Sequence, residues 1–116
     1  MIFVIDDDEI MAECIAKATS SGDVLIFTNA IDAMQKISDG KIPELIFLDI
    51  LLDGPDGFTF LNELISYEDT AKIPIVMVSS LDFGNKDLST YGVVGMLNKD
   101  TMKPEDIKEY VRKYTK

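Results

Sequence analysis

The sequence has no histidine, no tryptophan and only one cysteine, Cys14. A single cysteine excludes a disulfide bond within the chain, and zinc sites of the usual Cys/His type are excluded as well. The lack of histidine also removes the commonest general base of enzymes and the usual activating partner of a nucleophile. Any chemistry in this chain therefore depends on carboxylates, hydroxyls and lysines.

Basic residues are also scarce. The chain has 11 Lys and Arg against 21 Asp and Glu, which gives a formal net charge of −10. This charge repels nucleic-acid backbones and anionic membranes, so neither is expected as a direct partner. Seven of the acids lie within residues 6–9 and 49–56. The negative charge is therefore concentrated in part, and these two windows are candidate site segments.

Long apolar runs are absent too. None approaches the roughly 20 residues that a membrane span needs, and no signal peptide precedes the first apolar run. We therefore expect no membrane insertion and a cytoplasmic location. The length of 116 residues fits a single domain over 1–116, with no separate output domain.

Five short apolar runs alternate with segments of helical spacing. This order predicts an α/β fold: a doubly wound, five-stranded parallel sheet with right-handed crossovers and helices on both faces. The predicted strands are Ile2–Ile5, Val24–Phe27, Leu45–Leu48, Pro74–Val78 and Val93–Leu97.

Caps and apolar stripes predict the helices. The first helix begins near Asp8, the second follows Asn29 as its cap, the third follows Gly57, and the last begins at Pro104. Periodicity places the following residues on the inner faces of the first and third helices: Ile10, Met11, Cys14, Ile15 and Ala18 in the first, and Phe58, Leu61, Leu64 and Ile65 in the third.

Polar side chains follow four of the five predicted strands. They are Asp6 and Asp7 after the first strand, Asp49 after the third, Ser79 after the fourth and Lys99 after the fifth. Because the strands of a parallel sheet all run the same way, these side chains should share one edge. Carboxylates that meet there would repel by roughly 4 kcal/mol per pair at about 4 Å. A hard divalent cation relieves that repulsion, and a ligand set of oxygens alone points to Mg²⁺.

A lysine and a hydroxyl beside a Mg²⁺-bound aspartate suit one reaction. They can surround a phosphoryl group on Asp49, because the cation and Lys99 neutralise its oxygens while Ser79 donates a hydrogen bond. Asp49 would then be the covalent nucleophile, as in other aspartyl-phosphate chemistry. We therefore take Asp49 as the candidate phosphoacceptor.

Four segments, in this order, resemble the response-regulator receiver domain of two-component signalling, of the stand-alone chemotaxis type. They are Phe3–Asp8 (FVIDDD), Leu48–Gly57 (LDILLDGPDG), Pro74–Ser80 (PIVMVSS) and Leu97–Lys99 (LNK). The resemblance extends over essentially the whole chain. It implies a flavodoxin-like fold with the strand order 2-1-3-4-5.

The resemblance also implies roles for individual residues. Asp49 would accept a phosphoryl group from a sensor histidine kinase or a histidine phosphotransfer protein. The chain would catalyse its own phosphorylation and dephosphorylation rather than act as a conventional enzyme. Lys99 would pair with the phosphoryl oxygens, and Ser79 would swing in as the switch. Mg²⁺, or Mn²⁺ in its place, would be bound by Asp7, Asp49, the backbone carbonyl of Leu51 and, through water, Asp6.

The signal would leave the domain through phosphorylation-dependent protein contacts or through onward relay of the phosphoryl group. The chain would be a monomer or a weak, phosphorylation-dependent dimer. Three features depart from the family pattern. Met96 stands where an aromatic residue is usual, and Asp100 follows Lys99 where proline is common. The segment between the fourth and fifth strands is short and interrupted by Gly84, so the fourth helix, over Leu81–Tyr91, is expected to be short or irregular.

Two other functions stay open at this point. A haloacid-dehalogenase-like, Mg²⁺-dependent phosphatase begins with a strand ending in Asp-x-Asp, and Asp6 and Asp8 have that spacing. Against it, Glu9 and Ile10 replace the Gly-Thr that usually follows. A phosphorylation-independent adaptor would bind partners without a reactive site, and the complete set of site residues argues against it.

Overall fold

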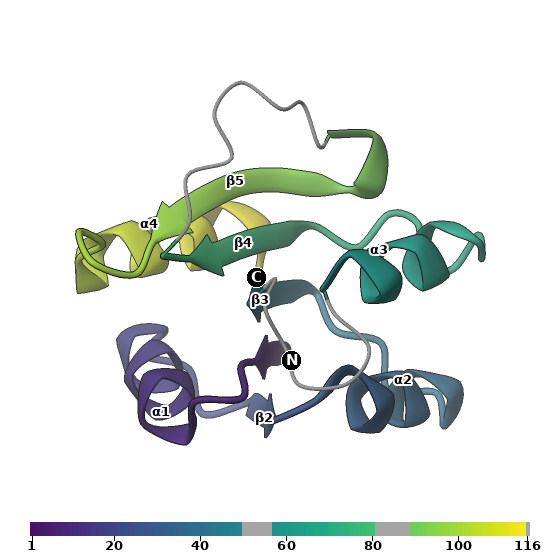
Figure 1. Ribbon diagram of the computed structural model, residues 1–116, viewed down its shortest axis with the longest axis horizontal. Helices are drawn as coiled ribbons and strands as arrows, with labels where there is room; N and C mark the ends of the chain where they lie inside the picture. Colours follow the sequence, from purple (N-terminus) through teal and green to yellow (C-terminus); the bar gives the residue numbers. More distant parts are fainter. Residues whose placement is uncertain (50–56, 81–88, 116) are drawn as a thin grey trace.

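The computed structural model of the chain describes residues 1–49, 57–80 and 89–115. Five parallel strands form one sheet in the order β2-β1-β3-β4-β5 (Figure 1), which confirms the predicted topology. The strands are β1 (Ile2–Ile5), β2 (Val24–Phe27), β3 (Leu45–Asp49), β4 (Ile75–Ser79) and β5 (Val93–Asn98).

Two pairs of helices cover the two faces of this sheet (Figure 1). The pair on one face is α1 (Glu9–Ala18) and α4 (Pro104–Tyr114), and the pair on the other is α2 (Ala30–Ser38) and α3 (Gly57–Ile65). None of the described helices has the length and the apolar content that a membrane span requires.

The core consists of one apolar layer on each side of the sheet. Val4, Phe47 and Ile107 belong to the layer beneath α1 and α4. Phe3 and Leu48 belong to the layer beneath α2 and α3. Successive side chains of a strand point to opposite faces, so a strand covered on both sides is apolar at every position. This explains the uninterrupted apolar runs that precede Asp6 and Asp49.

Side-chain caps fix where the first two helices begin. The carboxylate of Asp8 accepts the backbone N–H groups of Ile10 and Met11, at 3.1 and 3.2 Å, so Asp8 is the N-cap of α1. Asn29 caps α2 as predicted, because its side chain accepts the N–H of Asp32 at 2.8 Å. Each cap satisfies backbone N–H groups of the first helical turn that have no partner within the helix.

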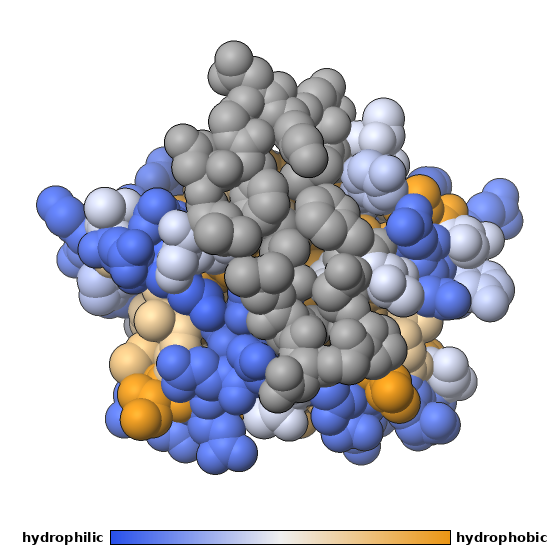
Figure 2. Space-filling view, in the orientation of Figure 1, coloured by the Kyte–Doolittle hydropathy of each residue, from blue (hydrophilic) through white to orange (hydrophobic). Residues whose placement is uncertain are grey.

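The predicted inner face of α1 is wrong at two positions. Ile10 is 77% exposed and Cys14 is exposed, whereas Ala12 and Ile15 are buried. Successive residues of an α-helix are about 100° apart, so residues two positions either side of Ala12 lie on nearly the opposite face. Cys14 is therefore a surface thiol. Figure 2 shows an apolar patch at the place of α1, at the lower left.

The predicted inner face of α3 is partly wrong. Leu61 and Leu64 are buried as expected, but Phe60 joins them and Ile65 is 37% exposed. Ile65 is the last residue of α3 and lies at the edge of the buried face, about 40° around the helix beyond Leu61. The side chain of Phe58 lies outside the described residues.

The segment between β4 and β5 is described only in part. Towards its end, Ser89–Tyr91 form a 3₁₀ turn, η1. Residues 81–88 lie outside the described part of the chain, so the prediction of a short or irregular helix there is untested.

Candidate functional site

The carboxyl ends of four strands meet at one edge of the sheet. β1 and β3 pair with Ile5 opposite Leu48, so the next residues, Asp6 and Asp49, follow at the same level. At the end of β4, the Ser79 carbonyl accepts the backbone N–H of Lys99 at 3.0 Å. The register of the sheet therefore brings these four residues to the same edge.

Three carboxylates cluster at this edge. Asp6, Asp7 and Asp49 each offer one oxygen, and these oxygens all lie within 4.8 Å of one another. Asp6 and Asp49 are buried, at 1% and 5% exposure, whereas Asp7 is exposed. The cluster is therefore accessible from the side of Asp7, while the other two acids lie in a less polar environment that strengthens charge interactions.

The ammonium group of Lys99 lies between the two buried acids. Its Nζ is 2.9 Å from Oδ2 of Asp6 and 3.2 Å from Oδ2 of Asp49. Burial by itself lowers the pKa of Lys99, but the close contact with the negative charge of Asp6, together with that of Asp49, outweighs burial and raises the pKa above its ordinary value. The group therefore stays charged at neutral pH.

Asp6 is held through both of its oxygens. Its Oδ1 accepts the backbone N–H of Asp8 at 2.9 Å, and its Oδ2 is the oxygen paired with Lys99. That pair is electrostatic: Oδ2 is fully buried and, among the described residues, has no directed hydrogen bond. An acid fixed in this way orients Lys99 as well as contributing charge. For a receiver domain, the sequence predicted only a metal role through water for Asp6, and the pair with Lys99 was not predicted.

No signal in the sequence separates Asp6 from Asp7. Both faces of β1 are buried, so the alternation of side chains along the strand does not predict which of the two acids is buried. In the structure Asp6 is buried and Asp7 is exposed.

The remaining predicted residues can be placed as follows. Ser79 is the last residue of β4 and is 3% exposed. The residue before it, Val78, is the register partner of Asp49 in the pairing of β3 with β4. Leu51, whose carbonyl is a predicted metal ligand, lies outside the described residues. The structure thus brings five of the predicted site residues to one edge of the sheet, namely Asp6, Asp7, Asp49, Ser79 and Lys99.

The donor set at this edge fits a hard divalent cation. Three carboxylates face one ammonium group, so the described charges leave the cluster negative. Carboxylate oxygens without Cys or His are what Mg²⁺ and Mn²⁺ prefer.

This chain belongs to the response regulator receiver domain family, whose family model matches residues 2–112. Two curated relatives are similar over most of the chain. The sensor histidine kinase CheAY of Helicobacter pylori is 28% identical over 83 residues, which are 69% of this chain and 10% of that protein. The response regulator PleD of Caulobacter vibrioides is 29% identical over 83 residues, 70% of this chain and 18% of that protein. The chain thus spans a small part of both relatives.

Solved receiver structures share the fold over nearly the whole chain. The receiver domain of NtrX from Brucella abortus is 25% identical, with a TM-score of 0.78, and the match covers 98% of this chain and 97% of that one. The receiver domain of the sensor histidine kinase PA1611 from Pseudomonas aeruginosa, solved with a magnesium ion coordinated in its active site cleft, is 19% identical with a TM-score of 0.80, covering 97% and 94%. The Mn²⁺-bound form of the response regulator Rcp1 is 20% identical with a TM-score of 0.71, covering 97% and 88%.

Proposed function

We propose that this chain accepts a phosphoryl group on Asp49 and acts as a Mg²⁺-dependent switch in two-component signalling. One observation supports this most strongly. A buried aspartate at the end of β3 has its carboxylate oxygen 3.2 Å from the Lys99 ammonium and within 4.8 Å of oxygens from two further acids. In a chain of the receiver family, this combination suits a nucleophile whose product needs charge neutralisation.

The phosphoryl donor in this proposal is a phosphohistidine on a sensor kinase or a phosphotransfer protein. A carboxylate oxygen of Asp49 forms the new O–P bond while the N–P bond of the donor breaks, and the released imidazole takes a proton from water. The ammonium group of Lys99 then pairs with a phosphoryl oxygen, and the carboxylate of Asp6 holds this ammonium group in place. Ser79 donates its hydroxyl hydrogen to another phosphoryl oxygen, which draws the end of β4 towards the site.

The metal assignment is part of the proposal. Asp7 and Asp49 would hold Mg²⁺, or Mn²⁺ in its place, with the backbone carbonyl of Leu51 as a further ligand and Asp6 acting through water. The magnesium ion of the PA1611 receiver and the Mn²⁺ of Rcp1 support a cation in this cleft. When bound, the cation supplies neutralisation of charge on the transferring phosphoryl group.

The output is proposed to be a change in protein contacts, or relay of the phosphoryl group to a histidine of another protein. We propose that residues 1–116 work as one receiver unit in the cytoplasm, where the kinase domain would deliver the phosphoryl group. A monomer or a weak, phosphorylation-dependent dimer fits this role.

The phosphatase alternative has less support. It needs Asp6 as nucleophile and Asp8 as its acidic partner two residues on. The Asp8 carboxylate accepts two backbone N–H groups of α1. Asp8 is therefore engaged as a helix cap. The adaptor alternative becomes an outcome of the experiment below.

Labelling by a small phosphodonor tests the proposal. The chain is incubated with Mg²⁺ and an acyl phosphate or phosphoramidate, and the added phosphate is measured by intact-protein mass spectrometry. Asp49→Asn should abolish labelling, because a neutral amide is not a nucleophile. The matched control is Asp100→Asn, an exposed acid next to Lys99, which should label normally. Labelling that persists in Asp49→Asn would reject the assignment, and no labelling of the unaltered chain would favour the adaptor.

A further inference from the structure

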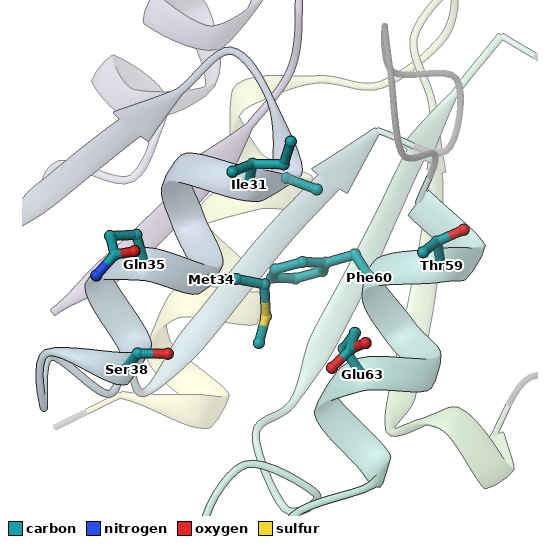
Figure 3. A pocket seen from close by; sticks show the side chains of 8 residues that line it. Ile31, Met34, Gln35, Ser38, Thr59, Phe60 and Glu63 are labelled. Atoms are coloured by element: carbon teal, nitrogen blue, oxygen red, sulfur yellow. The ribbon is translucent and has the colours of Figure 1, made fainter.

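Two adjoining cavities lie between α2 and α3, and Figure 3 shows the side chains that line the first of them. The first, of about 340 Å³, is lined by Ile31 and Met34 from α2 and by Phe60 and Glu63 from α3. The second, of about 300 Å³, shares Met34 and Glu63 with the first and extends to Tyr67. Together they form one groove along the two helices, the α2–α3 groove.

The floor of the α2–α3 groove is apolar and partly open to solvent. Figure 3 shows the Phe60 ring extending from α3 towards Met34 on α2. Ile31, in the first cavity, is 62% exposed, and Tyr67, in the second, is 56% exposed. Each cavity therefore offers a large side chain with substantial apolar surface still to be buried. Contiguous surface of this kind marks docking sites more often than single exposed residues do.

The shape of the groove suits side chains better than a small molecule. Each cavity is at the lower limit of the roughly 300–1,000 Å³ that ligand sites occupy. Two such hollows in succession, along a channel between two helices, match the spaced anchors of an amphipathic helix, which come from positions i, i+3 or i+4, and i+7.

The charged residues that line the groove favour a positively charged partner. Two acids line it, Glu63 in both cavities and Asp69 in the second, and none of the described lining residues is Lys or Arg. Figure 3 shows the Glu63 side chain beside the groove, next to Phe60. The chain as a whole carries −10. A second copy of this chain would therefore be repelled, whereas a basic segment would be attracted.

We propose that the α2–α3 groove binds a basic amphipathic helix of a partner protein, with apolar anchors in the two cavities and a Lys or Arg facing Glu63. None of the carboxylate-cluster residues lines this groove. Binding there therefore needs no phosphoryl transfer and stands independently of the function proposed above.

A pair of synthetic helices tests the proposal. Both peptides have Leu at positions i, i+4 and i+7 and are stapled to hold the helix, and they differ only in having Lys or Glu at the flanking positions. Binding to the isotope-labelled chain is followed by NMR. We expect the Lys peptide to shift resonances of α2 and α3, and the Glu peptide to bind at least about tenfold more weakly, a difference of about 1.4 kcal/mol.

Matched variants locate the contact. Ile31→Gln should weaken binding of the Lys peptide by about five- to tenfold. Ile10→Gln should leave it unchanged, because Ile10 is also the second residue of a helix and also exposed, but lies on α1. Glu63→Gln should weaken the Lys peptide and strengthen the Glu peptide, whereas the same change at Glu13, an exposed α1 residue, should do neither.

Four results would overturn the proposal. They are no binding of the Lys peptide, equal binding of both peptides, resonance shifts confined to α1 and α4, and concentration-dependent shifts of α2 and α3 without peptide. The last result would show that a second copy of the chain occupies the groove.

Discussion

The ammonium group of Lys99 is a tethered cation within the carboxylate cluster. Among the described residues, it is the cation that contacts both Asp6 and Asp49. A buried carboxylate without a partner is costly, and two of them at the same level of adjacent strands also repel each other. Lys99 therefore supports the folded state as well as any phosphorylated one.

Removal of this cation should destabilise the fold. Lys99→Met should lower the free energy of unfolding by roughly 1–3 kcal/mol, below the 3–5 kcal/mol typical of a broken buried pair because Lys99 is partly exposed. Urea unfolding measures the change, and added Mg²⁺ should restore much of it. Lys108→Met, which removes an exposed lysine of α4, should have little effect. Equal stability of Lys99→Met and the unaltered chain would show that the pair contributes nothing.

The pH dependence of the same pair has a definite sign. The acids beside Lys99 raise its pKa in the folded state, despite the opposing effect of burial. A raised pKa means that the stabilisation is complete below the ordinary lysine pKa of about 10.4 and is lost as pH rises through the folded-state value. The stability difference between the chain and Lys99→Met should thus be constant from about pH 7 to 9 and shrink above about pH 10.5. A difference that vanishes near neutrality would contradict this.

The sequence predicted that the site residues lie at one edge of the sheet. It did not predict which of their side chains pair with each other. Asp6 and Asp7 are chemically identical in the sequence, and both follow the same apolar run. Only the pleat and register of β1 against β3 make one buried and paired with Lys99 and the other exposed. The role of Leu51 stays a prediction.

Elements were predictable where one physical signal dominates. The strands follow from continuous apolar runs, and the start of α2 follows from the cap Asn29. The inner face of α1 could not be predicted, because Ile10 and Cys14 are as apolar as the residues of α1 that are buried. Which stripe of a short helix faces the sheet depends on how the helix is rotated about its axis, and the apolar pattern of α1 does not determine that rotation.

β5 and α4 approach each other closely at Gly95. A Cβ on Gly95 would lie 2.7 Å from Cε1 of Tyr110 and closer still to its hydroxyl. The phenol ring of α4 therefore rests on β5 where the strand has no side chain. Burial raises the pKa of Tyr110, and Tyr114 and the acids Glu109 and Asp106 add to the effect.

Gly95→Ala should push Tyr110 off the strand. We expect a loss of about 1–2 kcal/mol of stability, reduced somewhat because alanine suits a strand better than glycine does. The pKa of Tyr110, followed by ultraviolet titration, should fall towards its ordinary value as burial is lost. In a Tyr110→Ala background, Gly95→Ala should be neutral or stabilising. An equal loss in both backgrounds would show that the ring does not set the need for glycine.

At the scale of the whole molecule, the charge of −10 acts together with the carboxylate cluster. General repulsion among surface acids is weakened by any salt, since screening depends on ionic strength. The carboxylates of the cluster are partly buried, so salt screens the repulsion between them much less. A divalent cation bound at the cluster should therefore stabilise the chain beyond what its ionic strength explains.

Thermal unfolding in Mg²⁺ and in NaCl of equal ionic strength separates the two effects. At about 100 times its dissociation constant, a ligand that binds only the folded state contributes about 2.7 kcal/mol, or about 10 °C for a domain of this size. NaCl should give a smaller rise. Asp7→Asn should remove most of the Mg²⁺-specific part and leave the NaCl response intact, because its carboxylate is the exposed member of the cluster.

Asp8→Asn is the matched control for this experiment. It removes one negative charge from the neighbouring position, and asparagine caps a helix about as well as aspartate does. Its Mg²⁺ response should therefore equal that of the unaltered chain. If Mg²⁺ and NaCl raised the midpoint equally, or if Asp8→Asn lost the Mg²⁺ response as fully as Asp7→Asn, the stabilisation would come from general screening. The carboxylates at the ends of β1 and β3 would then not form a specific cation site.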